Sequence, residues 1–305
     1  MITVVITTRN DERTIMECLS SLVPQTAGSG HEIVVLDDAS ADRTAAIVKE
    51  KYPAVRLIAE PRHVGWVVIL RRYISELRGD AVAFLGSHCT ADPDWLRTAE
   101  SLLDSGSQVA SGFGRHGRGR WLDRFEALSM HAEYLRHQPG EVSILWDDNF
   151  LIRRDLLARA LPATSVALSD GTGATLLSRC LHGMGEALPY RPELRITHAG
   201  TSVKAQFRTW SRDMARNAID IRRADATMPL AGALSWGPVA AFPIAAGRWI
   251  HGLKGMIGSR RDLGVGFAEL FLHGLLFTLI MAAYGGGLLR ELMSREVPGE
   301  PDLSA

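Results

Sequence analysis

The stretches VVITTRN (residues 4–10) and IVVLDDAS (residues 33–40) decide the fold of this chain. Each begins with a short run of aliphatic, mostly β-branched residues and ends in polar side chains, which is typical of a strand buried on both faces. Between the two stretches, apolar residues recur at helical spacing and share one helix face, namely Ile15, Cys18, Leu19 and Leu22. The sequence therefore predicts a β-α-β unit with parallel strands.

Two further apolar runs extend this alternation. They lie at residues 55–58 (VRLI) and 82–85 (VAFL), and segments with helical periodicity separate them. Right-handed crossovers then give an α/β fold with a mostly parallel sheet and helices on both faces, and ligands bind such sheets beyond the carboxyl ends of the strands. We therefore expect residues 7–10, 37–40 and 86–88, which follow three predicted strands, to lie along one crevice.

Composition and charge limit which partners the protein can bind and in which cellular compartment we expect it. The chain has 305 residues, with 34 Lys and Arg against 34 Asp and Glu, so no excess of positive charge indicates a nucleic-acid partner. Cys18, Cys89 and Cys180 lack both zinc-site spacing and the density of a disulfide scaffold, which favours a reducing cytosol. No basic and long apolar leader precedes the first strand, so we expect no signal peptide.

The last third of the sequence has a different composition. Residues 226–247 and 270–289 carry no charged side chain, and each stretch is long enough, at about 20 residues, to span a bilayer. Four basic residues lie between them, namely Arg248, Lys254, Arg260 and Arg261. Prolines in the first stretch and consecutive glycines in the second interrupt a simple spanning helix. We therefore expect membrane-associated helices within residues 225–292, with buried or oligomer-forming helices as the alternative, and a disordered tail at 293–305.

The two opening stretches resemble those of the family 2 glycosyltransferases. In that family an apolar strand runs into a Thr-x-Asn turn and a second apolar strand ends in Asp-Asp-x-Ser-x-Asp, which residues 4–10 and 32–44 match at the right separation. The resemblance implies a GT-A catalytic domain over residues 1–224. It also implies that a group of residues holds the nucleotide of a nucleotide sugar, namely Thr7, Arg9, Asn10, Asp37 and Gly65. For Asp38 and Asp42, Asx turns and helix caps explain the aspartates equally well.

The metal motif of that family is absent. The family binds the donor diphosphate with Mg²⁺ or Mn²⁺ through an Asp-x-Asp motif, and Gly86-Ser87-His88 stands in its place. The resemblance implies that Ser87, His88 and the later His198 lie beside the diphosphate, with His88 either a metal ligand or a cationic substitute, since Mn²⁺ accepts imidazole. Two alternatives stay open. Either basic side chains such as Arg71 neutralise the diphosphate with little or no metal, or donor binding has decayed.

A third match concerns the acceptor side. Residues 147–154 (DDNFLIRR) resemble the family's Asn-x-x-x-Arg-Arg segment, and Ser169-Asp170 occupies the place of its Glu-Asp pair. The resemblance implies an acceptor site near Asp148 and Asn149. It also makes Asp170 the general base that removes the proton of the acceptor hydroxyl in an inverting transfer. The alternative is that residues 169–173 form only a turn that enters a helix.

The function implied by the resemblance is transfer of a hexose from a UDP- or GDP-linked donor to a polysaccharide, glycolipid or lipid-linked acceptor. We expect it at the cytoplasmic side of the membrane, in the synthesis of cell-envelope polysaccharides. One alternative is a catalytically silent GT-A domain that binds a partner or the membrane, which the missing metal motif favours. Another, a nucleotidyltransferase, calls for a Gly-rich basic loop after the first strand, and residues 7–10 are not one.

Overall fold

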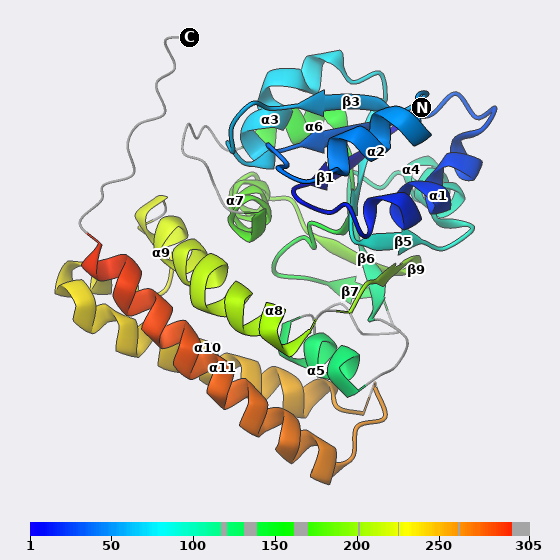
Figure 1. The fold of residues 1–305 in the computed structure, drawn as a ribbon. Helices are drawn as coiled ribbons and strands as arrows, with labels where there is room; N and C mark the ends of the chain where they lie inside the picture. The colour runs from blue at the N-terminus through cyan, green and yellow to red at the C-terminus, as the bar shows by residue number, and fades with distance from the viewer. Residues whose placement is uncertain are drawn as a thin grey trace. The chain divides into compact units, whose positions relative to one another are not determined.

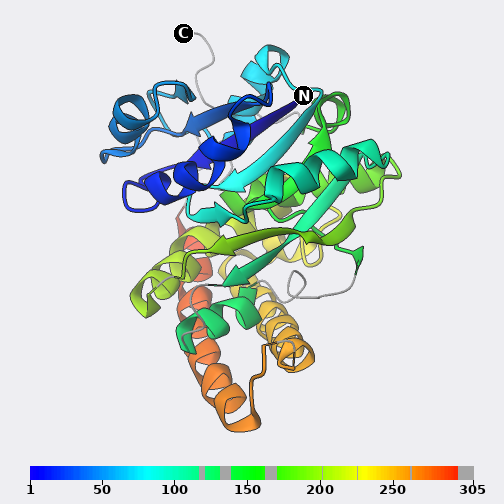
Figure 2. The same cartoon turned by 90° about the vertical axis from the view of Figure 1, so that its right-hand side faces the viewer.

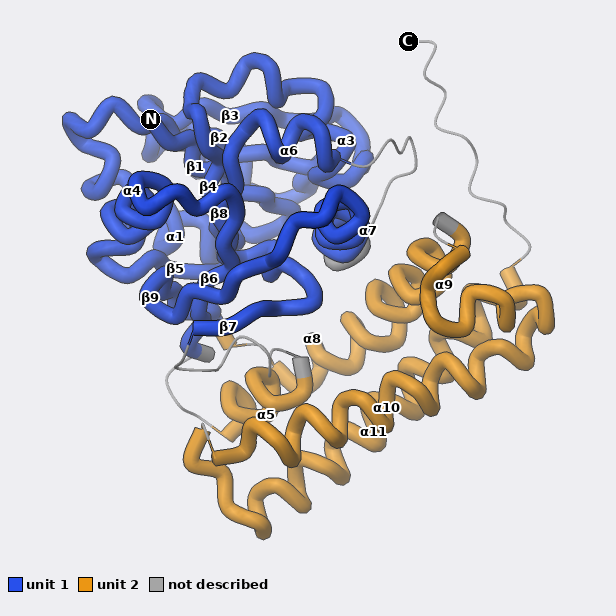
Figure 3. Tube along the Cα trace, turned by 180° about the vertical axis from the view of Figure 1, so that it is seen from behind, with its two compact units in different colours: residues 1–115, 137–199 blue, residues 116–136, 200–305 orange. Residues whose placement is uncertain are grey.

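The chain folds into two compact units (Figure 3). The computed structural model describes residues 1–116, 121–130, 139–161, 170–200, 202–224, 226–261 and 263–294. Unit 1 comprises residues 1–115 and 137–199, and unit 2 comprises residues 116–136 and 200–305. This division differs from the boundary expected at residue 224. The reason is that Phe125, Trp210 and Ile219 belong to the same buried cluster as the C-terminal helices.

Unit 1 is built on one mixed sheet with the strand order β3-β2-β1-β4-β8-β6-β9-β5, and β7 pairs with β9. The strands are β1 (Ile2–Thr8), β2 (Glu32–Asp37), β3 (Arg56–Ala59), β4 (Ala81–Gly86), β5 (Cys89–Ala91), β6 (Val109–His116), β7 (Gly140–Glu141), β8 (Asn149–Arg153) and β9 (Pro189–His198). Strands β1 to β4 are parallel, whereas β8 is antiparallel to β4 and β6 is antiparallel to β8. The predicted apolar runs correspond to β1 to β4, which confirms the expected α/β fold.

Helices cover both faces of this sheet (Figures 1 and 2). They are α1 (Ile15–Thr26), α2 (Thr44–Lys51), α3 (Trp66–Tyr73), the 3₁₀ turn Ile74–Glu76, α4 (Trp95–Asp104), α6 (Arg154–Ala160) and α7 (Asp170–Gly183). Helices α1 and α2 contact each other on one face, and α6 and α3 lie on the other, where both contact α7. The central strands are enclosed between these layers, since Val5 of β1, Val34 of β2 and Ala83 of β4 are all 0% exposed.

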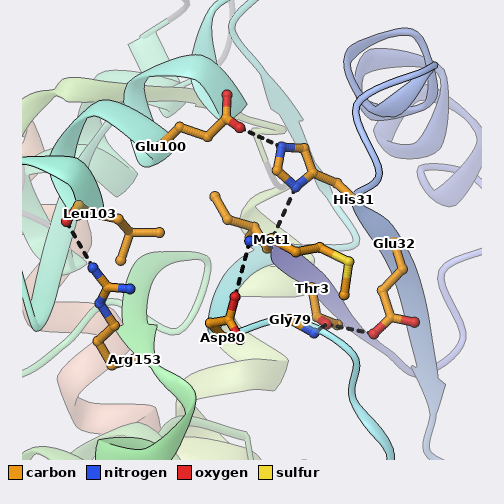
Figure 4. A network of polar contacts seen from close by, with 10 residues as sticks. Met1, Thr3, His31, Glu32, Gly79, Asp80, Glu100, Leu103 and Arg153 are labelled. Carbon is orange, nitrogen blue, oxygen red and sulfur yellow. Dashed lines mark hydrogen bonds and ion pairs between the residues drawn. The ribbon is translucent and has the colours of Figure 1, made fainter.

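A partly buried polar network fixes the amino ends of β1 and β2 (Figure 4). The hydroxyl of Thr3 donates to Glu32 at 2.6 Å and accepts from the backbone amide of Gly79 at 2.9 Å. On the neighbouring turn, Nδ1 of His31 accepts from the amide of Ile2 at 2.9 Å. Each of these groups has a partner inside the protein, so its burial carries no desolvation penalty that is left uncompensated. The network therefore fixes the sheet register at the edge opposite to the carboxyl ends of the parallel strands.

Unit 2 is a helical bundle around an aromatic core. Its elements are α5 (Trp121–Met130), α8 (Val203–Arg208), a π-helical segment (Thr209–Met214), α9 (Ala215–Ala224), a 3₁₀ segment (Gly232–Ala240), α10 (Ala241–Ser259) and α11 (Phe267–Met293). The indole of Trp210 packs edge-on against Phe277 and Tyr284, with ring centroids 6.2 and 5.7 Å apart. Gly287 lets α11 approach the π-helical segment, because a Cβ atom there would lie 2.2 Å from the carbonyl oxygen of Ser211.

The two uncharged stretches of the sequence lie in different elements of this bundle. Residues 226–247 run through the 3₁₀ segment into α10, with a break at Gly237, where φ is 63°. Residues 270–289 lie inside α11, which is long and apolar enough to cross a membrane by length and composition. One face of α11 is buried in the bundle, and the other exposes apolar side chains. Helix α11 ends at Met293, and residues 295–305 of the tail expected to be disordered lie outside the described residues.

Substitution of Gly287 by alanine tests the close contact made by α11. The added methyl group would collide with Ser211 and lie 2.9 Å from Cβ of Ala215, so we expect the free energy of unfolding to fall by about 1–3 kcal/mol. The matched control is Gly286→Ala. An added Cβ at Gly286 has no neighbour within 4 Å, and alanine should stabilise the helix by up to about 1 kcal/mol. Urea unfolding measures both variants, and equal effects would contradict the proposed packing.

Candidate functional site

The carboxyl ends of β1 and β2 form one half of the candidate site. The amide of Asn10 donates to the hydroxyl oxygen of Ser40 at 2.9 Å, and the amide of Ala41 donates to Oδ1 of Asn10 at 2.8 Å. Asp37 is 2% exposed, and its Oδ1 accepts from both the amide and the hydroxyl of Ser40, at 3.1 and 2.5 Å. The turns after the two strands are thus joined. They bring together four of the residues expected at the nucleotide, namely Thr7, Arg9, Asn10 and Asp37.

Asp38 has structural partners on the other side of the same turn. Its Oδ1 accepts from the amide of Val64 at 2.7 Å, and its Oδ2 accepts from the amide of Gly65 at 2.8 Å and lies 2.7 Å from Nδ1 of His63. Burial alone raises the pKa of Asp38, but these hydrogen bonds and the charge of His63 outweigh it and lower the pKa. Asp38 therefore shapes the loop that starts α3. The amide of Gly65, a residue expected at the nucleotide, donates to this carboxylate.

Asp11 links this half-site to the end of β4. Its Oδ2 accepts from the hydroxyl of Thr8 at 2.9 Å, from the amide of Arg9 at 3.0 Å and from the hydroxyl of Ser87 at 2.5 Å. Ser87 directly follows β4 and is 2% exposed. One carboxylate therefore joins the carboxyl ends of two neighbouring parallel strands, as expected for residues that follow such strands.

The other half of the site is a cluster of metal-ligating groups formed by His88, Cys89, Asp148 and His198. Their ligand atoms all lie within 4.8 Å of one another. Nε2 of His88 lies 3.0 Å from Nε2 of His198 and 3.4 Å from Oδ2 of Asp148, and the same carboxylate oxygen lies 3.7 Å from Nε2 of His198. The side chains of His198 and Asp148 are 6% and 13% exposed, whereas that of His88 is 36% exposed. The cluster is therefore accessible through His88.

Electrostatics favour a positive charge on His88. Burial lowers its pKa, but the carboxylate of Asp148, followed by those of Asp11 and Asp147, outweighs this effect and raises the pKa of His88 to about 10. In the absence of a metal ion, His88 is therefore an imidazolium at neutral pH. Its charge has the sign that a diphosphate group requires.

The donor set of the cluster fits a divalent transition-metal ion. Imidazole and carboxylate ligands both suit Mn²⁺, whereas Mg²⁺ prefers oxygen ligands alone. The ring nitrogens of His88 and His198 and the carboxylate oxygen of Asp148 lie 3.0, 3.4 and 3.7 Å from one another, so they can share one ion at metal–ligand distances of about 2.0–2.3 Å. His88 and His198, both expected near the diphosphate, are thus brought together, and the cluster can hold a metal ion.

Asn149, which we expected at the acceptor site, lies in the core instead. This residue is 0% exposed, its Oδ1 accepts from the indole of Trp95 at 2.9 Å, and its Nδ2 donates to the carbonyls of Phe113 and Leu194 at 3.0 and 2.8 Å. Both polar atoms of its side-chain amide are therefore hydrogen-bonded inside the core and do not face a substrate. Asp148, expected on the same side, lies instead with the two histidines of the cluster.

Asp170 is the first residue of α7, so the segment that follows it is helical rather than only a turn. Its side chain and all of Ser169 lie outside the part of the chain that the structure describes. The first turn of α7 packs tightly on α3, because a Cβ atom on Gly173 would lie 2.7 Å from Val67 and 2.8 Å from the ring of Trp66. The helix that begins at Asp170 is therefore held against α3.

Sequence reasoning missed three residues of this edge, namely Asp11, Cys89 and Trp146. The position of Asp11 directly after the first strand was a usable signal, although the start of a helix also explains an aspartate there. Trp146 stacks on His198 with ring centroids 6.1 Å apart and an interplanar angle of 27°. No local pattern connects these residues, because the pairing of β1 with β4, of β4 with β8 and of β5 with β9 brings them together.

Asp38→Asn tests the loop contact at the start of α3. The amide cannot replace a charged acceptor of several hydrogen bonds, so we expect the free energy of unfolding at neutral pH to fall by about 2–3 kcal/mol. Because the folded-state pKa of Asp38 is lowered, its contribution is complete above the unfolded pKa of about 4 and is lost as pH falls through the folded pKa. Urea unfolding between about pH 6 and pH 3 should therefore show less pH dependence in the variant.

The exposed pair of Asp94 with Arg97 supplies the control. Asp94→Asn should change the free energy of unfolding by less than about 1 kcal/mol, because exposed ion pairs stabilise weakly. If Asp38→Asn proved as stable as Asp94→Asn, the structural role of Asp38 would be wrong.

Comparison with known proteins identifies the family of this chain. Residues 3–161, more than half of the chain, match the model of Glycosyl transferase family 2. A segment of 137 residues, 44% of the chain, is 38% identical to the Succinoglycan biosynthesis protein ExoO of Rhizobium meliloti. A segment of 114 residues is 29% identical to the Dolichol-phosphate mannosyltransferase of Pyrococcus furiosus. These matches cover 36% and 32% of the two relatives, so the chain spans about a third of their length.

Solved structures share the fold over nearly the whole chain. The Mannosyltransferase PcManGT from Pyrobaculum calidifontis, in complex with GDP-Man and Mn²⁺, has a TM-score of 0.60 at 18% identity over 97% of this chain and 88% of its own. TarS from S. aureus, in complex with UDP-GlcNAc, has a TM-score of 0.52 at 16% identity over 94% of this chain and 89% of its own. At such identities the likeness shows the GT-A fold alone.

Proposed function

Because this chain belongs to glycosyl transferase family 2, we propose that it transfers a sugar from a nucleotide-sugar donor to a hydroxyl acceptor, with inversion at the anomeric carbon. One observation carries the proposal. The loop of Asp37 and the cluster of His88, Asp148 and His198 lie at the same edge of one sheet, and Asp11 joins the ends of β1 and β4 between them. Such an edge suits a ligand with a nucleoside at one end and a diphosphate at the other.

The donor is proposed to be a UDP- or GDP-linked hexose. The complexes of PcManGT with GDP-Man and of TarS with UDP-GlcNAc support this class of ligand. Asp37 would accept hydrogen bonds from the base or ribose, since Ser40 holds one carboxylate oxygen and burial strengthens hydrogen bonding. Arg9 and Asn10 are exposed beside it and would border the nucleotide together with Thr7 and Gly65.

The cluster is proposed to hold the diphosphate. When bound there, a divalent ion would neutralise the negative charge that develops on the departing nucleoside diphosphate. His88, Asp148 and His198 would hold that ion, and in its absence the imidazolium of His88 supplies one positive charge at the same position. Either the bound ion or the charge of His88 would take the place of the Asp-x-Asp motif that is missing at residues 86–88.

Asp170 is the proposed general base. It would remove the proton of the acceptor hydroxyl while the hydroxyl oxygen forms a bond to the anomeric carbon and the bond to the nucleoside diphosphate breaks. The attachment of α7 to α3 supports this role, because the start of α3 is itself fixed by Asp38 in the loop next to Asp37. The acceptor is proposed to be a polysaccharide, glycolipid or lipid-linked sugar, as the name of the relative ExoO suggests.

Calorimetric titration with UDP and GDP, with and without Mn²⁺, tests the donor site. We expect one of the two nucleotides to bind, and Asp37→Asn to weaken its affinity by about tenfold or more, because a charge-assisted hydrogen bond is lost. The partly exposed neighbour Asp42, which accepts from the amides of Glu12 and Thr44, provides the control, and Asp42→Asn should retain most of the affinity. Absence of binding of either nucleotide to the unaltered protein would overturn the proposal.

The Asp170→Asn variant separates binding from turnover in the same experiment. It should bind the nucleoside diphosphate as the unaltered protein does and lose transfer of the sugar by about 10²-fold or more. A wild-type protein that binds the nucleotide but transfers no sugar to any acceptor would instead favour the catalytically silent domain.

Unit 2 is proposed to attach the enzyme to the cytoplasmic surface of a membrane. Every fourth residue along one face of α11 is a large apolar side chain with at least half of its surface exposed, namely Phe267, Phe271, Leu275 and Leu279 at 72%, 66%, 50% and 60%. Contiguous exposed apolar surface of this kind is unusual on a soluble monomer. Arg260, whose guanidinium lies 4.0 Å from the ring centroid of Phe267, and the exposed Lys254 would meet anionic headgroups.

Flotation with vesicles tests this attachment. The protein should bind vesicles that contain anionic phosphatidylglycerol, and the double substitution Phe271→Ser with Leu279→Ser should reduce binding by about tenfold or more, since each buried methylene contributes about 0.8 kcal/mol. Met184→Ser removes an exposed apolar residue of unit 1 and should have no effect. Unchanged binding by the double variant, or a stable dimer that buries this face without vesicle binding, would refute the membrane contact.

A further inference from the structure

The position of Gly86 is coupled to that of Asp148. Strands β4 and β8 run antiparallel with Leu85 opposite Asn149, and one step further the amide of Gly86 donates to the carbonyl oxygen of Asp148 at 3.1 Å. The side chain of Asp148 then fills the space beside the glycine. A Cβ atom on Gly86 would lie 2.0 Å from Oδ1 and 2.7 Å from Cγ of Asp148. No side chain at residue 86 can therefore coexist with Asp148 in its present position.

Gly86 also stands in the place of the first aspartate of the Asp-x-Asp motif, which this sequence lacks. The carboxylate of Asp148 lies in the space that a side chain of residue 86 would enter. Asp148, however, directly precedes the neighbouring strand β8 and does not belong to β4. We propose that Asp148 supplies the carboxylate ligand of the divalent ion in place of residue 86, and that Gly86 is required to admit it. This inference rests on the proposed function, and it assigns the ion-binding role to Asp148, His88 and His198.

The environment of Asp148 suits a ligand rather than a surface charge. Its side chain is 13% exposed, and Oδ2 lies 3.4 Å from Nε2 of His88 and 3.7 Å from Nε2 of His198. The two ring nitrogens are 3.0 Å apart, so the nitrogen and oxygen atoms converge on one small volume. A mostly buried carboxylate is stabilised by pairing with a positive charge or by coordination of a metal ion, and both are open to Asp148 here.

A cluster of histidines and one aspartate in place of an Asp-x-Asp motif changes which metal ion the site prefers. An Asp-x-Asp motif offers oxygen atoms only, whereas the cluster described here offers two nitrogen atoms and one carboxylate, with the thiol of Cys89 also within 4.8 Å. Nitrogen ligands favour Mn²⁺ over Mg²⁺, because Mg²⁺ demands oxygen donors in a near-octahedral arrangement. The two nitrogen ligands therefore predict a site that binds Mn²⁺ and discriminates against Mg²⁺.

The experiment follows the electron paramagnetic resonance signal of free Mn²⁺ during titration of the full chain with MnCl₂, alone and in the presence of UDP or GDP. The unaltered protein should take up one Mn²⁺, and an equal concentration of Mg²⁺ should displace little of it. Asp148→Ala should weaken the affinity by about tenfold or more. Gly86→Ala should weaken it to a similar degree although it removes no ligand, because the methyl group displaces the carboxylate.

Two further variants complete the test. Gly183→Ala, where an added Cβ meets no atom within 4 Å, should bind Mn²⁺ as the unaltered protein does. The exchange variant Gly86→Asp with Asp148→Gly should regain most of the affinity that Asp148→Ala loses, and it guards against misreading a variant that fails to fold. Unaltered Mn²⁺ affinity in Gly86→Ala or Asp148→Ala would overturn the proposal, as would absence of Mn²⁺ binding in the unaltered protein. If UDP or GDP still bound in that last case, the donor site would stand and only this ligand assignment would fall.

Discussion

The backbone pairing of β4 with two neighbours is the constraint on which unit 1 depends. On one side β4 pairs in parallel with β1, so that the ends of both strands point to the same edge. On the other side it pairs antiparallel with β8, so that the start of β8 meets the end of β4. The first pairing brings the turn after β1 next to Ser87, and the second brings Asp148 next to Gly86. A shift of either register by one residue would turn these side chains to the other face of the sheet.

The aspartates at the carboxyl ends of the parallel strands have different roles, and the groups that each contacts show the difference. Asp11 and Asp38 each accept at least two hydrogen bonds from backbone or side-chain donors, and these bonds fix the loops after β1 and β2. Asp37 is oriented through one oxygen by Ser40. Asp148 lies beside two histidines. A buried carboxylate that faces imidazoles is suited to an ion, whereas one that accepts from amides is suited to holding a loop.

The sequence predicted the parts of this structure that depend on local periodicity. The strands that became β1 to β4, and the polar residues that follow them, could be identified because a period of two or of 3.6 is visible in a short window. The partnership of Gly86 with Asp148 could not, because 62 positions separate the residues and only strand pairing unites them. Asn149 was misassigned for the same reason, since nothing near it in sequence reveals the buried carbonyls of Phe113 and Leu194. The contribution of residues 200–224 to unit 2 likewise depends on long-range burial of Trp210 and Ile219.

The ion-binding role of Asp148 can be tested by a crystal structure of the full chain with bound nucleoside diphosphate and Mn²⁺, with data collected to reveal the anomalous signal of manganese. We expect one manganese peak bound by Asp148, His88 and His198 and by the diphosphate, with the nucleoside beside Asp37. Manganese held without Asp148, or a nucleotide bound away from the carboxyl ends of β1 and β2, would contradict it.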